Sequence, residues 1–110
     1  MIIYEVNLSI LNSRSEEFLI WLKAHIQEML KLPGFESAHL SQIKESAIPE
    51  VGCQSYSVHY FLKDQSALDS YFETHAERMR SEGKMLFKED FKAERRVLSL
   101  MSFLPDKVSP

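Results

Sequence analysis

Four histidines have the most obvious capacity for chemistry in this sequence, and two of them fall inside expected helices. His25 and His75 each lie within the apolar stripe of a helix-period pattern. An imidazole titrates near neutral pH, so each could act as a general acid or base. We take both as candidate catalytic residues and expect both side chains to be mostly buried. The alternative interpretation is a neutral core imidazole that bonds a backbone carbonyl or a tyrosine.

His39 and His59 form a second pair, each in an expected strand. In one register of those strands they are direct cross-strand neighbours on one sheet face. Doubled by symmetry in a dimer, they could bind a metal ion. No acidic or cysteine residue accompanies them at a spacing typical of metal ligands, so we expect no metal site. We interpret them as polar residues of a wet interior.

Four tyrosines could supply hydroxyl groups to a ligand-binding cleft: Tyr4, Tyr56, Tyr60 and Tyr71. Aromatic side chains also fill protein cores without any further role. Both interpretations of the tyrosines stay open at this point.

Arg95 and Arg96 are adjacent in an expected strand, so alternation sends them to opposite faces of the sheet. One of them could pair with Glu5 or Glu94, or bind a ligand that carries a carboxylate. We favour the ion pair.

The elements that must position these residues follow a simple order. Alternating and β-branched or aromatic runs predict strands at about 2–10, 35–43, 54–62 and 91–103. Helix-period stripes predict helices over about 13–31 and 66–83. The order β-α-β-β-α-β is that of the ferredoxin-like fold, an α+β fold in which a four-stranded antiparallel sheet carries both helices on one face.

Capping patterns set the expected ends of the helices. Ser13 and Glu16 form a capping-box pattern, and Ser66 is the expected N-cap of the second helix. Gly83 is expected to end that helix in a left-handed conformation. In one continuous helix, Arg80 falls on the polar side and points away from the core.

Helices on one face leave the other face of the sheet uncovered. Its expected residues mix polar and aromatic side chains: Asn7, His39, His59 and Phe61. Such a mixture is better explained by a partner sheet than by open water. We therefore expect a homodimer whose two sheets face each other as a barrel-like sandwich.

Length and composition narrow the class of protein. The chain of 110 residues is expected to form one domain over residues 1–104, with a flexible tail at 105–110. The net charge of −3, with no basic run longer than Arg95-Arg96, excludes a general nucleic-acid binder. The one cysteine, Cys53, indicates a reducing compartment. No signal-peptide pattern or membrane-spanning apolar run is present, so we expect a cytoplasmic protein that does not bind membranes.

Several segments together resemble a family of short bacterial proteins of about 100 residues, catalogued as a domain of unknown function. They are MIIYEVNL, AHIQEML, FESAHLSQI, SYSVHY and YFETHAERMRSEGKMLFKEDFKAERRVL. That family is similar to the dimeric α/β-barrel superfamily. The superfamily includes cofactor-free antibiotic-biosynthesis monooxygenases, haem-degrading monooxygenases, isomerases and ligand-sensing regulatory domains. The resemblance implies the ferredoxin-like fold and the dimer, and it leaves the function open.

The resemblance also implies a test for haem chemistry. Haem-degrading members use an asparagine in the first strand, a tryptophan early in the second helix and a histidine further along that helix. Asn7 matches the first position, but Tyr71 replaces the tryptophan. Arg80 or Ser81 stands where the ligand histidine belongs, and His75 comes too early. We therefore expect no haem and no other cofactor.

Three functions remain after these exclusions. The first is binding of a small, mostly apolar metabolite in a cleft between the helices and the sheet. The second is a cofactor-free monooxygenase- or isomerase-like enzyme that uses His25 and His75. The third is a non-catalytic structural or regulatory dimer.

Overall fold

Alternation along β1 (Ile2–Leu11) decides which face of the sheet is covered. Tyr4, Val6, Leu8 and Ile10 are all buried on one face, as a period-two pattern requires. The computed structural model, which describes residues 1–104, completes the sheet with β2 (Phe35–Gln42), β3 (Cys53–Leu62) and β4 (Phe91–Ser99). The strand order is β2-β3-β1-β4, and every pairing is antiparallel.

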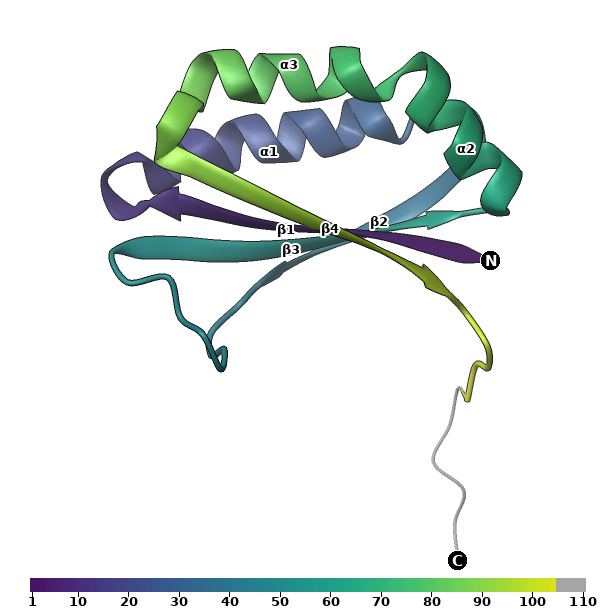
Figure 1. Cartoon of the computed structure of the whole chain (residues 1–110), viewed down its shortest axis with the longest axis horizontal. Coiled ribbons are helices and arrows are strands. Elements are labelled where there is room, and N and C mark those ends of the chain that lie inside the picture. Colours follow the sequence, from purple (N-terminus) through teal and green to yellow (C-terminus); the bar gives the residue numbers. More distant parts are fainter. Residues whose placement is uncertain (105–110) are drawn as a thin grey trace, which may run out of the picture.

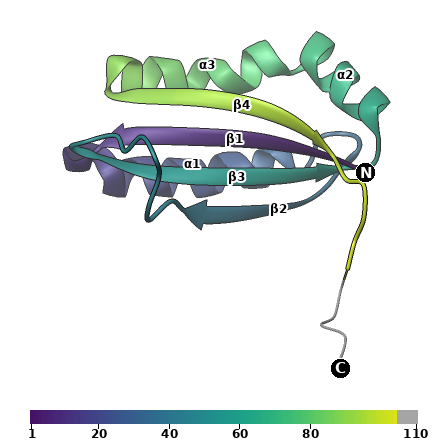
Figure 2. The same ribbon diagram turned by 60° about the horizontal axis from the view of Figure 1, so that its bottom comes forward.

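Three helices cover the buried face of this sheet (Figure 1). They are α1 (Ser15–Met29), α2 (Gln65–Thr74) and α3 (Ala76–Phe87), and two 3₁₀ turns, η1 (Asn12–Arg14) and η2 (Lys88–Asp90), precede α1 and β4. The same view turned by 60° shows the strands in front and the helices behind or beside them (Figure 2). The predicted α+β ferredoxin-like fold is confirmed. None of the helices in residues 1–104 has the length and apolar composition required to cross a membrane.

The second predicted helix is two helices, so its predicted ends were wrong. Asp64 is the N-cap in place of Ser66, because its side chain accepts a hydrogen bond of 2.9 Å from the Ala67 amide. The helix is interrupted at His75, where φ is −121° and ψ is −27°. The side of the helix that faces the core therefore differs between α2 and α3. Gly83 does not end a helix, since α3 continues to Phe87.

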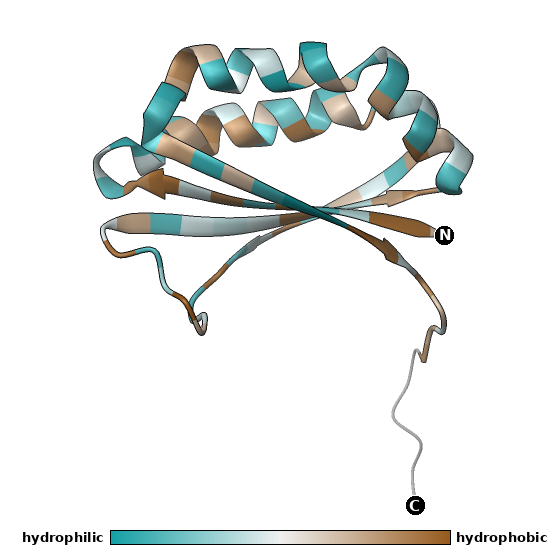
Figure 3. Cartoon of the chain, viewed as in Figure 1, coloured by the Kyte–Doolittle hydropathy of each residue, from teal (hydrophilic) through white to brown (hydrophobic). Residues whose placement is uncertain are grey.

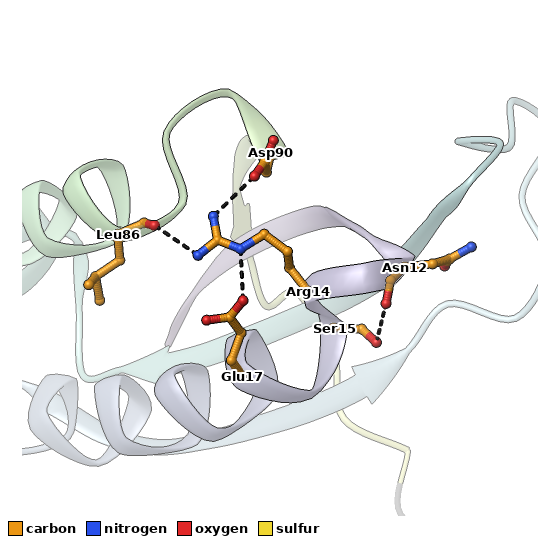
Figure 4. Close-up of polar contacts among 6 residues, drawn as sticks. All are labelled: Asn12, Arg14, Ser15, Glu17, Leu86 and Asp90. Atoms are coloured by element: carbon orange, nitrogen blue, oxygen red, sulfur yellow. Dashed lines mark hydrogen bonds and ion pairs between the residues drawn. The ribbon is translucent and has the colours of Figure 1, made fainter.

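Arg14 organises the start of α1, where the expected Ser13–Glu16 capping box is replaced by the turn η1. Its guanidinium donates to Glu17 Oε1 at 2.8 Å, to Asp90 Oδ2 at 3.1 Å and to the Leu86 carbonyl at 3.1 Å (Figure 4). The Leu86 carbonyl belongs to the last turn of α3, which a cation stabilises. Arg14 therefore fixes the spacing between α1 and α3.

The strands end close to the predicted positions, with one exception. β4 stops at Ser99, whereas the alternation predicted a strand to residue 103. The side chains of Met101, Phe103 and Leu104 are at least three-quarters exposed, so these three residues make few contacts within residues 1–104. The tail predicted at 105–110 lies outside the described residues.

The face of the sheet away from the helices, here called the open face, carries a mixed set of side chains. His39 and His59 are direct cross-strand partners on it, in the register that the sequence left open. Asn7 and Phe61 share this face with them. Figure 3 shows that the middle of β4 is strongly hydrophilic between more hydrophobic ends.

Candidate functional site

A cleft of about 270 Å³ lies between the helices and the covered face of the sheet. Its floor includes Tyr4 and Val6 of β1 and Tyr60 of β3. One wall is α1 with Trp21 and Leu22, and the opposite wall is α3 together with η2. This volume is just below the range of about 300–1,000 Å³ typical of drug-sized ligands, so the cleft suits a smaller molecule.

Trp21 of α1 and Gly83 of α3 lie in close contact and both line the cleft. A Cβ atom at Gly83 would lie 2.9 Å from Cη2 of the Trp21 indole. The indole Nε1–H donates to Glu82 Oε1 at 2.6 Å, which holds the ring against α3. Gly83 is thus explained by the close approach of an aromatic ring and not by a left-handed backbone.

Three of the four candidate tyrosines line the cleft. Tyr4 contacts both Tyr60 and Tyr71, at centroid distances of 6.0 and 5.7 Å. Burial raises the pKa of Tyr60, and burial together with the nearby Tyr4 raises the pKa of Tyr71 to about 12. Tyr60 and Tyr71 therefore stay protonated at neutral pH and keep O–H groups. Tyr56 lies outside the cleft lining and packs on Phe18, with ring centroids 6.4 Å apart.

Of the two helix histidines, only His25 lines the cleft. Its imidazole stacks on Trp21, with centroids 4.7 Å apart. Desolvation lowers its pKa against a smaller opposing effect of Glu82, so the ring is neutral at pH 7.

His75 sits at the junction of α2 and α3, where its Nδ1 lies 2.9 Å from a guanidinium nitrogen of Arg78. It does not line the cleft, so the fold does not bring it together with His25 there. Each histidine exposes less than about a third of its surface, so both are mostly buried, as the sequence predicted. His75 lies at the helix break between α2 and α3.

Four cations line the cleft: Arg80, Lys84, Lys88 and Arg95. Of these, only Arg95 was considered from the sequence as a ligand-binding residue. Arg80 donates to the hydroxyl of Tyr4 at 2.9 Å. It had been assigned to the polar side of one long helix, and the break at His75 changes that phase. The position of Arg80 could not be predicted, because a helix break is set by packing as well as by local sequence. The position of Arg95 could be predicted in part, because alternation in β4 sends it to the face opposite Arg96.

On the open face, Glu5 is buried to 4% exposure and gathers three partners. Arg96 donates to both of its carboxylate oxygens at 2.5 and 3.0 Å, Asn7 donates at 2.9 Å, and His59 Nε2 lies 3.0 Å from Oε1. The hydrogen bond from Arg96 is the largest cause that lowers the Glu5 pKa to about 2. The favoured ion pair is thus made by Arg96.

The remaining candidates on the open face lie around this network. The His39 ring is exposed and contacts Phe61 edge-on at 5.1 Å. Asn7 also lines a polar hollow of about 600 Å³ between the sheet and the loop after β2. Within residues 1–104, no three His, Cys, Asp or Glu side chains are grouped so that they could hold a metal ion.

Comparison with known families gives the classification of this chain. Residues 1–101 match the model of the family described as domain of unknown function (DUF4286). The chain belongs to this family. The resemblance noted in the sequence is therefore confirmed for this DUF4286 protein, although the family description assigns no activity. No curated protein matches the chain.

Solved structures place the DUF4286 chain among ferredoxin-like folds. A Bacillus halodurans protein of the ethyl tert-butyl ether D (EthD) family has a TM-score of 0.65 at 14% identity, covering 92% of this chain and 100% of that one. SnoaB, a cofactor-independent oxygenase from Streptomyces nogalater, has 0.60 at 15%, covering 96% and 98%. A dimeric ferredoxin-like protein of unknown function from Jannaschia sp. CCS1 has 0.56 at 16%, covering 91% and 100%. At these identities the likeness shows the fold alone.

Proposed function

We propose that this DUF4286 protein binds a small, mostly apolar molecule in the cleft between α1, α3 and the sheet. The observation that supports this most is a preformed cavity of about 270 Å³ with an aromatic floor and a few polar groups at its edge. Ligand sites are typically concave, mostly apolar and equipped with a small number of oriented polar groups. A core that served packing alone would be filled, since protein interiors contain few voids larger than a water molecule.

The test uses Trp21, the one tryptophan of the chain, as a reporter. Its side chain lines the cleft, so a bound molecule should shift the single indole N–H resonance in a ¹H–¹⁵N spectrum. A screen of one- and two-ring metabolites is expected to yield a ligand that shifts this resonance and raises the melting temperature, because a ligand that binds only the folded state stabilises it.

A cleft-filling variant supplies the matched control. Ala93 lies on the floor in β4, and Ala93→Phe is expected to retain the fold and abolish the shift. Ala24→Phe adds the same side chain on the exposed side of α1 and should leave binding intact. A ligand that binds the Ala93→Phe variant as well as the wild type would place the binding site elsewhere.

A second candidate function, acid–base catalysis on the bound molecule, is favoured by one observation. His25 lines the cleft as a neutral imidazole at pH 7, which is the protonation state that a general base requires. For this function, His25→Gln would remove turnover of a ligand while leaving its dissociation constant within about threefold. A ligand that the wild type binds without change would leave binding as the function.

We also propose that the protein is a homodimer joined through the open faces of two sheets. Phe61, Ile3 and Leu98 are half-buried apolar side chains on that face, next to the Glu5 network. Apolar groups on a solvent-facing sheet are better covered by a partner. The similar protein from Jannaschia sp. CCS1 is described as dimeric.

Light scattering is expected to give a mass near twice 12.8 kDa. Phe61→Glu places a charge in the middle of the proposed interface and should yield a folded monomer, since an unpaired charge at a buried interface is costly. Ile20→Glu, on the exposed side of α1, should remain dimeric. A wild-type protein that is monomeric and fully folded at micromolar concentration would refute this assembly.

A further inference from the structure

The charges around the cleft are sorted by sign, although the chain as a whole is acidic. The whole sequence has 13 Lys and Arg against 16 Asp and Glu. Yet four of the residues that line the cleft are cations, namely Arg80, Lys84, Lys88 and Arg95, and among the described residues no Asp or Glu lines it. Glu82 binds the Trp21 indole beside the cleft, but the four lining cations outnumber it. An excess of cations produces a positive potential that favours an anionic group.

Arg95 reaches the cleft because of its position in β4. It pairs in register with Val6, so its side chain is on the covered face of the sheet. The side chain of its neighbour Arg96 is on the open face and forms an ion pair with Glu5. No ion pair of Arg95 is formed within residues 1–104, so its guanidinium is available to a ligand.

Arg80 approaches the same region from α3. One terminal nitrogen donates to the Tyr4 hydroxyl, and its Nε is buried without a hydrogen-bond partner in the described part of the chain. A buried donor without an acceptor is unfavourable, so an acceptor supplied by a ligand would stabilise the complex. A guanidinium prefers a carboxylate for that purpose.

Both arginines line the same cleft. The pKa of Tyr71 is raised mainly by burial, and Arg80 and Arg95 both oppose that rise. The two guanidinium groups come from different elements, α3 and β4, so an anion between them would be held from two sides.

We propose, resting on the binding function above, that the ligand is a small aromatic or alicyclic carboxylic acid. Its ring lies on the floor formed by Val6 and Tyr60, beside Trp21, and its carboxylate binds Arg80 and Arg95. Lys84 and Lys88 contribute to the positive potential at the entrance. The small volume of the cleft limits the ring system to one or two rings.

The experiment compares two probes of nearly identical shape, 2-naphthoate and 2-naphthamide, by titration calorimetry at low ionic strength. The naphthoate is expected to bind about tenfold or more tightly, since hydrogen bonds to charged groups are about twice as strong as neutral ones. The naphthamide should still bind, because its ring makes the same apolar contacts.

Variants then assign the difference to the two arginines. Arg80→Gln and Arg95→Gln should each weaken naphthoate about tenfold and change naphthamide little, because each loses one charge-assisted contact. Two controls remove a positive charge elsewhere on the same elements. Arg78→Gln alters α3 outside the cleft lining, and Lys92→Gln alters the open face of β4; both should keep naphthoate binding within about twofold. Circular dichroism and the melting temperature show whether each variant is folded.

The outcomes separate this inference from the function on which it rests. Equal affinity for both probes would overturn the carboxylate specificity and leave a cleft that binds apolar rings. The same holds if Arg78→Gln weakens naphthoate as much as Arg95→Gln does, since net charge and not the site would then be responsible. If neither probe binds at millimolar concentration, the carboxylic acid inference fails, and the broader screen with the Ala93→Phe control decides the binding function.

Discussion

Replacing Gly34 by alanine is expected to lower the free energy of unfolding by about 3 kcal/mol, from backbone strain and a steric clash together. Gly34 lies between α1 and β2 with φ at +83°, a conformation that side chains disfavour. A Cβ at this position would lie 2.3 Å from the Cβ of Ala67 in α2. The Gly34 carbonyl also accepts a hydrogen bond of 2.9 Å from the Lys63 amide, so the backbone has little freedom to relax.

Gly52 supplies the matched control for this substitution. Its φ is +81°, nearly the same, but a Cβ there would meet no atom within 4 Å. Gly52→Ala should therefore cost about 1 kcal/mol, the backbone contribution alone. Urea denaturation of both variants measures the two values. If they prove equal, the close contact between Gly34 and α2 does not limit stability.

Much of the fold could be predicted because the alternation within each strand shows which side chains share a face of the sheet. Alternation in β1 places Tyr4 and Val6 on one face and Glu5 and Asn7 on the other, without knowledge of any other segment. The short connection between β2 and β3 leaves an antiparallel hairpin as the simple solution. Both inferences depend on local information.

The second helix was harder because its geometry depends on residues far away in the sequence. Gly83 has the local signature of a helix end, yet its lack of a side chain serves the Trp21 ring, which comes from α1. Nothing near Gly83 in the sequence announces that contact. In the same way, the break at His75 has no proline or glycine to mark it.

The phase error in that helix explains what was missed in the candidate site. A continuous helix sends Arg80 away from the core, whereas the break after Thr74 turns it toward Tyr4. His75 shows the converse error, because the sequence suggested a place in the cleft whereas the residue lies at the junction of α2 and α3. His25 lines the cleft and the tyrosines of β1 and β3 lie on the covered face, because α1 is unbroken and the strands alternate.

Wild-type stability is expected to fall steeply below about pH 4.5, and Glu5 should account for a separable part of that loss. The pKa of Glu5 is lowered from 4.5 to about 2, chiefly by its hydrogen bonds from Arg96. A depressed carboxyl pKa means that the unfolded chain takes up the proton first. The contribution is therefore fully present above about pH 5 and is lost as the pH falls toward about 2.

Glu5→Gln isolates this contribution because the amide keeps the size of the side chain and lacks the charge. At pH 7 the variant should be less stable by about 2 kcal/mol, a value below the full shift because Arg96 is partly screened by solvent. The difference should shrink through pH 4 and 3 and approach zero near pH 2. Urea denaturation at fixed protein concentration gives each value and holds any dimerisation constant.

Glu94→Gln is the control. Glu94 is an exposed carboxyl in β4 on the same open face of the sheet as Glu5, and it makes no ion pair within residues 1–104. Its substitution should change stability by less than about 0.5 kcal/mol at every pH. A Glu5→Gln difference that stays constant from pH 7 to pH 2 would mean that the carboxylate charge is not what stabilises the network. Glu5 lies on the face that we propose as the dimer interface. A stability difference between the wild type and Glu5→Gln that also depends on protein concentration would therefore link the Glu5 network to dimerisation.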